Sequence, residues 1–287
     1  MKKTFKKSLA SILFILTFAL VFTLFPAEQT QAATKITHKF GGVDYLLTKG
    51  KTVTIKNSYV VKWKSENSKI AAVNSKGKVV AKSGGVATII GTTQSGSTFS
   101  YDVGVKTSTF IPAYKTPYKV GKDIAAGTYV VIHDKKTTSS GSFTYWGIKT
   151  KKKNGKTLNN DGFSYTSIVS IKKGQYFEIN GGYAVPLKKA SKSLFTVKNL
   201  NKYTAGSSYS AAAKVGYGFP AGTYKFTLSK GNTYGRIEIL KSPKNNTYSY
   251  DKLIDSASVS EAKKSVTLTL KKGQYLFFEG CTLKKVN

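Results

Sequence analysis

The side chains that could do chemistry are few, and they lie far apart in the sequence. The two histidines are His38 and His133, and the single thiol is Cys281. Nucleophilic catalysis needs a base beside the Ser or Cys. His133 is followed by Asp134, but neighbours on a strand point to opposite faces, so neither can orient the other. We expect His133 to be a strand-end surface residue and Cys281 to be an inert, buried or half-buried thiol. A disulfide from Cys281 to another molecule stays open.

Acidic and phosphate-binding patterns are equally sparse. The closest carboxylate pair in a loop-like region is Asp251 and Asp255, and its expected role is to offset nearby lysines rather than to hydrolyse a glycoside. The triplets Gly155-Lys156-Thr157 and Gly50-Lys51-Thr52 end like a phosphate loop, but both lack the upstream glycine and open no helix. One Cys excludes a four-Cys zinc site and a disulfide within the chain. We predict no catalytic, cofactor or metal site, with a wall-acting enzyme as the rival class.

Positive charge is the dominant feature of the composition. The 287 residues include 46 Lys+Arg against 13 Asp+Glu, a net charge of +33, and Arg236 is the only arginine. This excess is larger than solubility requires, and self-repulsion costs stability, so it indicates polyanionic surroundings. Lysine is a compact point charge suited to diffuse attraction by phosphate, whereas specific phosphate or base recognition favours arginine forks.

The lysines are densest at 149–156, 188–202 and 263–272, and these runs and the repeat motifs described below supply the candidate polyanion-binding residues. We expect the partner to be an anionic wall polymer such as teichoic acid, an extracellular matrix or a host glycan. Extracellular DNA is the alternative, because aromatic residues interleave with lysine at 143–146 and 248–250. Tyr145 and Trp146, if exposed, could instead stack on sugar rings. The candidate residues are Lys149, Lys151, Lys152, Lys153, Lys172, Lys173, Lys188, Lys189, Lys271 and Lys272.

The N-terminus has the three parts of a secretory signal. A basic start at 2–7 precedes an apolar run at 9–25, and small residues follow at 32–33. Cleavage there would leave 42 basic and 12 acidic residues, a net charge of +30. The alternative is a retained membrane anchor, because the run reaches the lower limit for a span, about 17 residues. We predict cleavage, no later transmembrane segment, and secretion or wall association in a Gram-positive-type bacterium.

Short runs of alternating apolar and polar residues predict an all-β fold. Examples are 51–55, 128–132 and 266–270, which are rich in Thr, Val, Ile and Tyr and are bounded by Gly, Asn, Ser and Lys. The two short helix candidates are Ser210–Lys214 and Ser258–Lys264. Neither sustains a helical apolar stripe.

The C-terminal half contains an internal repeat. Lys-Val-Gly at 119–121 and Ala-Gly-Thr-Tyr at 126–129 return 95 residues later, and Lys-Lys-Gly-Gln-Tyr at 172–176 returns 99 residues later. The same order of motifs indicates tandem duplication. Each repeat is predicted to be a small β-sandwich or barrel, in which Ala-Gly-Thr-Tyr is a turn leading into a strand and Lys-Lys-Gly-Gln-Tyr joins two strands as a hairpin.

The preceding segment carries a different set of motifs, which includes Trp63-Lys64-Ser65 and Ile70-Ala71-Ala72-Val73. The spacing of further apolar and glycine positions resembles the bacterial immunoglobulin-like group 2 domain over residues 35–106. That resemblance implies a non-catalytic sandwich that serves exported and surface proteins as a spacer or adhesive module. The two repeats are in turn similar to Val-Gly-x-x-Ile-x-Ala-Gly-x-Tyr repeats of exported Gram-positive proteins. The matching positions of the immunoglobulin-like segment are Trp63, Ile70, Val73, Gly77, Val79, Ala81, Gly85, Ala87 and Ile89.

Together these patterns predict a signal peptide at 1–33, an immunoglobulin-like sandwich at 34–108, and two homologous β-repeat domains at 109–200 and 201–287. The expected function is that of an exported, non-enzymatic surface protein, held at the wall by lysine charge and acting as an adhesive or polymer-binding module. A secreted effector is a further class that no residue pattern separates from this one.

Overall fold

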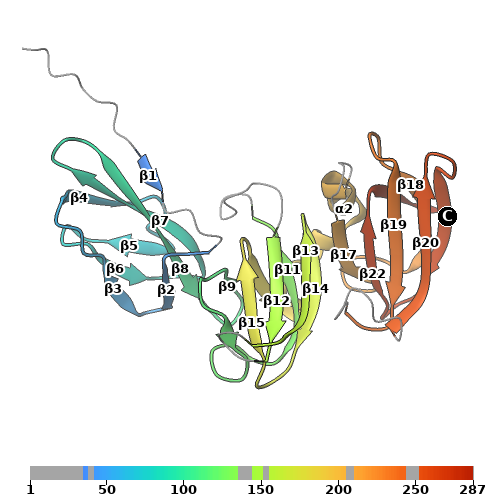
Figure 1. The fold of residues 1–287 in the computed structure, drawn as a ribbon, viewed down its shortest axis with the longest axis horizontal. Helices are drawn as coiled ribbons and strands as arrows, with labels where there is room; N and C mark the ends of the chain where they lie inside the picture. Colours follow the sequence, from blue (N-terminus) through green and yellow to red (C-terminus); the bar gives the residue numbers. More distant parts are fainter. Residues whose placement is uncertain are drawn as a thin grey trace, which may run out of the picture.

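The computed structural model describes residues 35–37, 42–134, 144–150, 155–204, 210–243 and 252–286. Most of them form strands, which confirms the all-β prediction. Three strand-rich units lie side by side along the long axis of the molecule (Figure 1). We call them the first unit (β1–β8), the first repeat (β9–β16) and the second repeat (β17–β23). The predicted signal segment lies outside the described residues.

The first unit is a two-sheet sandwich. One sheet has the order β1-β8-β7-β4, with β2 also paired to β8, and the other has the order β3-β6-β5. The core between them contains Ile55, Val79, Ile89 and Val103. The strand bounds are β1 Lys35–Thr37, β2 Tyr45–Thr48, β3 Thr52–Thr54, β4 Val60–Ser65, β5 Ala71–Val73, β6 Lys78–Ala81, β7 Gly85–Thr93 and β8 Thr98–Lys106.

Two glycines of the immunoglobulin-like pattern make room for its large side chains. A Cβ on Gly77, whose φ is +75°, would lie 2.6 Å from the Ile55 carbonyl oxygen and 3.1 Å from the Trp63 ring. A Cβ on Gly85 would lie 2.5 Å from the Ile70 side chain. The spacing of Trp63, Ile70 and the two glycines therefore reflects close packing inside one sandwich.

The first repeat is built from two sheets whose inner faces carry Trp146, Phe163 and Phe177. One sheet has the order β10-β15-β12-β13, and β11 lies between β14 and β16 in the other. Strand β9 pairs with β16 and so joins the first unit to this repeat. The strand bounds are β9 Ile111–Pro112, β10 Tyr118–Lys119, β11 Gly127–Ile132, β12 Thr144–Lys149, β13 Thr157–Phe163, β14 Thr166–Ile171, β15 Tyr176–Asn180 and β16 Tyr183–Pro186.

The second repeat has the same strand pairing. Strand β18 lies between β21 and β23, and the order β17-β22-β19-β20 matches β10-β15-β12-β13. Even the register shift at Ile148/Lys149 returns at Ile239/Leu240. The motif repeat thus corresponds to a repeat of topology. The strand bounds are β17 Ser210–Lys214, β18 Gly222–Leu228, β19 Tyr234–Leu240, β20 Leu253–Ser260, β21 Ser265–Leu270, β22 Tyr275–Glu279 and β23 Cys281–Val286.

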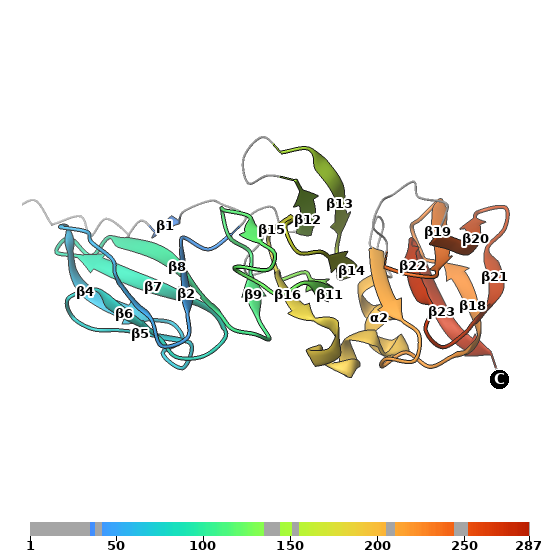
Figure 2. The same cartoon turned by 90° about the horizontal axis from the view of Figure 1, so that it is seen from below.

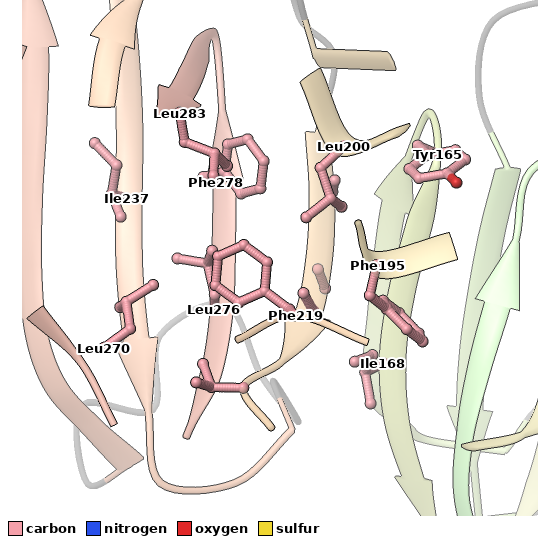
Figure 3. Close-up of a cluster of buried hydrophobic side chains, with 14 of the residues drawn as sticks. Tyr165, Ile168, Phe195, Leu200, Phe219, Ile237, Leu270, Leu276, Phe278 and Leu283 are labelled. Atoms are coloured by element: carbon pink, nitrogen blue, oxygen red, sulfur yellow. The ribbon is translucent and has the colours of Figure 1, made fainter. Parts of the chain in front are cut away.

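The two repeats share a sheet and a core. Strand β14 pairs in parallel with β17, so that eight strands from β20 to β9 form one sheet. At this joint the Thr166 hydroxyl donates to the Ala212 carbonyl at 2.9 Å, and the Ser210 N–H donates to Ser164 Oγ at 2.9 Å. Figure 3 shows Ile168 and Phe195 on one side of the shared core and Leu276 and Phe278 on the other.

A helical segment covers the joint. It consists of two 3₁₀ turns, η1 (Leu187–Lys189) and η2 (Lys192–Phe195), followed by α2 (Val197–Thr204). Phe195 and Leu200 are fully buried in the shared core. Figures 1 and 2 place α2 between the two repeats.

The predicted strands at 51–55, 128–132 and 266–270 are confirmed as β3, β11 and β21, but both helix candidates are wrong. Ser210–Lys214 is strand β17, because its small side chains fit between β14 and β22. Ser258–Lys264 begins in β20 and continues into the turn before β21. Helix propensity of alanine is overridden here by tertiary pairing.

Candidate functional site

Each repeat presents a cluster of lysines at one end of its sandwich, all of them exposed except Lys214, which is half-buried. The first lysine corner consists of Lys119, Lys172, Lys173 and Tyr176, and the second consists of Lys214, Lys271, Lys272 and Tyr275. In each corner one lysine ends the first strand in the order β10-β15-β12-β13 or β17-β22-β19-β20, and two more stand in the turn that connects β14 to β15 or β21 to β22. The hairpin predicted from Lys-Lys-Gly-Gln-Tyr is wrong. Strand β14 pairs with β11 whereas β15 pairs with β12, and β21 pairs with β18 whereas β22 pairs with β19, so each turn crosses from one sheet of the sandwich to the other.

Backbone hydrogen bonds hold the first corner in shape. The Val120 N–H donates to the Gln175 carbonyl at 2.9 Å, and the Gly174 N–H donates to the Val120 carbonyl at 3.0 Å. The Gln175 side chain accepts from the Lys172 N–H at 2.7 Å, which closes the turn. The Lys-Val-Gly and Lys-Lys-Gly-Gln-Tyr motifs are therefore one structure, assembled from two distant stretches of chain.

The second corner reproduces these bonds. Val215 donates to the Gln274 carbonyl at 2.9 Å, and Gly273 donates to the Val215 carbonyl at 3.0 Å. The Gln274 side chain accepts from the Lys271 N–H at 2.6 Å. The two corners therefore share their hydrogen-bond partners as well as their residue types.

Glycine in the Lys-Val-Gly motif leaves space for a lysine stem. Gly121 has a φ of +92°, and a Cβ there would lie 2.7 Å from Lys173 Cγ. Gly216 has a φ of +88°, and a Cβ there would lie 2.7 Å from Lys272 Cγ. Each glycine thus lets the apolar part of a lysine lie against the turn while the ammonium group remains in solvent.

A lysine and a tyrosine face each other in both corners. Lys119 Nζ lies 5.9 Å from the centre of the Tyr176 ring, and Lys214 Nζ lies 5.4 Å from that of Tyr275. A cation over an aromatic face is attracted by its quadrupole. Each contact positions one lysine ammonium group per repeat against an aromatic ring rather than against a carboxylate.

A cleft of about 580 Å³ lies where the three units meet. The first unit supplies Lys106, the first repeat supplies the turn at 125–127, the helical segment supplies Lys188, and the second repeat supplies Lys214 and Tyr275. Apolar side chains, including Ile111, Ile124 and Leu187, also line it. The second lysine corner therefore opens onto this cleft, whereas among the described lining residues none belongs to the first corner.

The wall of the cleft is held by contacts on both sides. The Lys106 ammonium group donates to the Asp123 carbonyl and lies 5.9 Å from the centre of the Tyr118 ring. The Tyr129 hydroxyl donates to the Ala125 carbonyl at 2.8 Å and fixes the turn at 125–127. Burial raises the pKa of Tyr129, so the hydroxyl keeps its proton.

The predicted polyanion-binding lysines fall into several places. Lys172, Lys173, Lys271 and Lys272 are exposed in the two corners. Lys188 lines the cleft, and Lys189 is exposed beside it on η1. Lys149 is paired with Glu178, with Nζ 2.6 Å from Oε2, so its charge is locally neutralised. Lys151, Lys152 and Lys153 lie outside the described residues.

Sequence reasoning missed Lys106, Lys119 and Lys214. A signal was present for the last two, because each begins a repeated Lys-Val-Gly motif. Nothing in the sequence around Lys106 indicates that the end of β8 would approach the turn at 125–127 of the first repeat.

The aromatic residues divide between core and surface. Trp146 is buried and donates from its indole N–H to Ser167 Oγ at 2.9 Å, whereas Tyr145 is 54% exposed. The ring pair proposed for sugar stacking is therefore reduced to Tyr145. Phe143, Tyr248 and Tyr250 lie outside the described residues.

The residues considered for catalysis lie apart from one another. His133 follows β11 and its Nδ1 is 3.0 Å from Thr144 Oγ1. Cys281 is buried, as predicted, and burial together with Glu279 raises its pKa to about 12. Asp255 accepts from the Ser256 N–H at 2.8 Å. His38 and Asp251 lie outside the described residues.

The described residues contain no group of three or more His, Cys, Asp or Glu side chains able to hold a metal ion. The Gly-Lys-Thr triplets at 50–52 and 155–157 lead into strands β3 and β13. Of the helices in the described ranges, none has the length and apolar character to cross a membrane.

Comparison with known proteins gives one family match and distant structural likenesses. No curated protein matches the chain. An intimin mutant of EHEC O157:H7 is 17% identical, with 47% of this chain and 87% of that chain covered and a TM-score of 0.20. The SGBP-B protein of the Bacteroides ovatus mixed-linkage glucan utilization locus, solved with a mixed-linkage heptasaccharide, is 15% identical, with 54% and 51% covered and a TM-score of 0.18. Residues 32–102 match the model of the bacterial Ig-like domain (group 2), which confirms that part of the sequence prediction.

Proposed function

We propose that this chain is an exported, non-enzymatic surface protein whose two repeats bind an anionic polymer outside the cell. The first unit serves as a spacer or adhesive module, as its bacterial Ig-like family suggests. The repeats would belong with the Val-Gly-x-x-Ile-x-Ala-Gly-x-Tyr repeats of exported Gram-positive proteins. The partner would be a wall polymer such as teichoic acid, and retention at the wall would depend on charge.

The observation that carries the proposal is the lysine corner, which occurs twice with the same hydrogen bonds. Lys172 and Lys173, like Lys271 and Lys272, are exposed on a turn held by a glutamine side chain and by backbone bonds. Lysines kept only for solubility need no such support. Two sites on a pair of repeats that share a sheet and a core can engage one polymer at two places, which raises avidity.

The arginine content favours diffuse binding of a polymer over recognition of bases. Arg236 is the only arginine, and it lies 3.5 Å from Glu238 Oε1 and 3.3 Å from Glu279 Oε1. Lysine ammonium groups attract repeated phosphate or carboxylate charges without fixed geometry. A polymer with regularly spaced anionic groups therefore fits better than extracellular DNA read by sequence.

The test is sedimentation of the protein with bacterial cell walls, with and without teichoic acid, over a salt series. A variant with Lys172, Lys173, Lys271 and Lys272 all changed to Gln loses four corner charges. We expect its binding to fall about tenfold or more, and the dependence on salt to become less steep by the number of lost contacts.

The matched control removes four exposed lysines from the first unit, Lys62, Lys64, Lys76 and Lys78, again as Gln. It has the same net charge as the corner variant. Equal losses of wall binding in the two variants would show that the corner lysines act only through the net charge of the protein. Binding that needs neither teichoic acid nor low salt would contradict the proposal.

A further inference from the structure

The cleft at the meeting point of the three units differs from the rest of the basic surface. Its three lysines, Lys106, Lys188 and Lys214, come from the first unit, the helical segment and the second repeat. One acid, Asp123, also lines the cleft, and its carboxylate accepts from the Lys119 N–H at 2.8 Å, so positive charge remains in excess. Mutual repulsion opposes gathering like charges around one concave space, and the gathering becomes favourable when an anion is bound there. This arrangement points to a discrete ligand as well as to a diffuse polymer.

The cleft is also too apolar for a free inorganic anion. Ile111, Ile124, Leu187 and Ala126 contribute to its lining, together with the ring of Tyr275. Apolar walls with a few polar groups are typical of sites for small organic molecules, and the volume falls within the usual range of about 300–1,000 Å³. The ligand should therefore combine an apolar face with a negative group.

The turn at 125–127 differs from its equivalent in the second repeat in what covers it. A Cβ on Gly127 would meet no atom within 4 Å, so the cleft is open at this point. At the equivalent Gly222 of the second repeat a Cβ would lie 2.8 Å from Lys285 Cε, so that turn is covered. The same sequence motif thus lines a cleft in one repeat and lies under a side chain in the other.

We propose that this cleft binds one acidic sugar unit, a pyranose ring that carries a carboxylate or a phosphate. The C–H face of the ring would pack on Tyr275 and the apolar wall, and the acidic group would face Lys188 and Lys214. The inference rests on the proposed function, since the sugar would be a residue of the anionic polymer or of an acidic glycan. It adds a saturable site to binding by distributed charge.

The experiment titrates three probes into the protein without its predicted signal segment. Binding is measured by calorimetry and by NMR. Glucose 6-phosphate carries a phosphate, a glucuronic-acid disaccharide carries a carboxylate, and cellobiose is neutral. We expect saturable one-to-one binding of at least one acidic probe, with cellobiose about tenfold weaker or more because it lacks the charge-assisted bonds. The two acidic probes distinguish a phosphate-bearing from a carboxylate-bearing source.

Two variants test whether the sugar binds in the cleft, and each has a control at the equivalent position of the other repeat. Ala126→Trp fills the cleft, whereas Ala221→Trp changes the corresponding exposed residue of the second repeat. Lys214→Gln removes a cleft ammonium group, whereas Lys119→Gln removes the corresponding one outside the cleft. We expect Ala126→Trp to abolish binding, Lys214→Gln to weaken it about tenfold, and both controls to bind like the wild type.

The outcomes separate this proposal from the function on which it rests. Loss of acidic-sugar binding in Ala126→Trp, with wall sedimentation retained, supports both. No saturable binding, equal binding of cellobiose, or binding unaffected by Ala126→Trp overturns the cleft site while wall sedimentation continues. Wild-type protein that fails to sediment with walls overturns the proposed function itself.

Discussion

Strands β11 and β18 begin with the same Gly-Thr-Tyr and then diverge. In β11 the next residues are Val130, Val131 and Ile132, all of them buried. In β18 the equivalent residues are Lys225, Phe226 and Thr227, and only the phenylalanine is buried. The equivalent strands are thus covered on two faces in the first repeat and on one face in the second.

The cause of the difference is what lies on the outer face. Val131 belongs to the core inside the first repeat, whereas Val130 and Ile132 belong to the core shared with the second repeat and the helical segment 187–204. A strand that is buried on both faces has a continuous run of apolar residues, whereas a strand with one solvent-exposed face alternates apolar and polar residues. The first repeat therefore depends on its neighbour for burial.

We expect the largest effect on stability when a residue of the first repeat is replaced by the equivalent residue of the second. Val130→Lys places an ammonium group in the shared core, where Val130 is fully buried. An unpaired buried charge costs about 3–5 kcal/mol, so we expect the free energy of unfolding to fall by that amount. Urea unfolding followed by circular dichroism measures it.

The reverse exchange serves as the control. Lys225→Val changes an exposed position of β18, and we expect the free energy of unfolding to stay within about 0.5 kcal/mol of the wild type. Similar losses in both variants would show that the outer face of β11 is not covered as described.

A smaller effect is expected at the joint between the repeats. Thr166 is fully buried, and its hydroxyl bonds to both the carbonyl and the N–H of Ala212, at 2.9 and 3.3 Å. Thr166→Val removes both bonds and leaves two backbone groups buried without them, which costs about 1–3 kcal/mol. Differential scanning calorimetry should show a lower melting temperature, and separation of one transition into two would reveal loss of coupling.

The matched position is Ser265, which lies 99 residues after Thr166 and begins β21. Ser265→Val should leave the free energy of unfolding within about 0.5 kcal/mol of the wild type, because among the described strands β21 pairs with β18 alone. A loss as large as that of Thr166→Val would mean that the hydroxyl stabilises the strand itself and not the joint.

Much of the fold was predictable from the sequence, because its signals are local. Alternation at 266–270 predicts β21, and the resemblance of the segment around Trp63, Gly77 and Gly85 to the bacterial Ig-like domain implies the first sandwich. The joint was not predictable in this way. Ser210–Lys214 reads as a short alanine-rich helix, and its pairing with β14 depends on residues about 45 positions away.

The residues of the candidate site also differ in whether a local sequence pattern predicts them. Lys172, Lys173, Lys271 and Lys272 belong to a repeated motif, so the sequence alone made them candidates. The cleft depends on how three units pack, which no local pattern encodes. Its one predicted member, Lys188, was chosen because it stands in a dense lysine run, and its place beside Lys214 became visible only in the structure.

The smallest predicted effect concerns Cys281, which occupies the position of Gly182 in the first repeat. Burial, helped by Glu279, raises the thiol pKa from 9.0 to about 12. The unfolded thiol therefore ionises first, so stability is retained below about pH 9 and declines toward pH 12. By pH 10 the wild type should lose about 1 kcal/mol more than Cys281→Ala does, relative to pH 8, in urea unfolding. Tyrosines and lysines titrate in both proteins, so the difference isolates the thiol. Parallel curves would mean that the Cys281 thiol is as accessible in the folded chain as in the unfolded one.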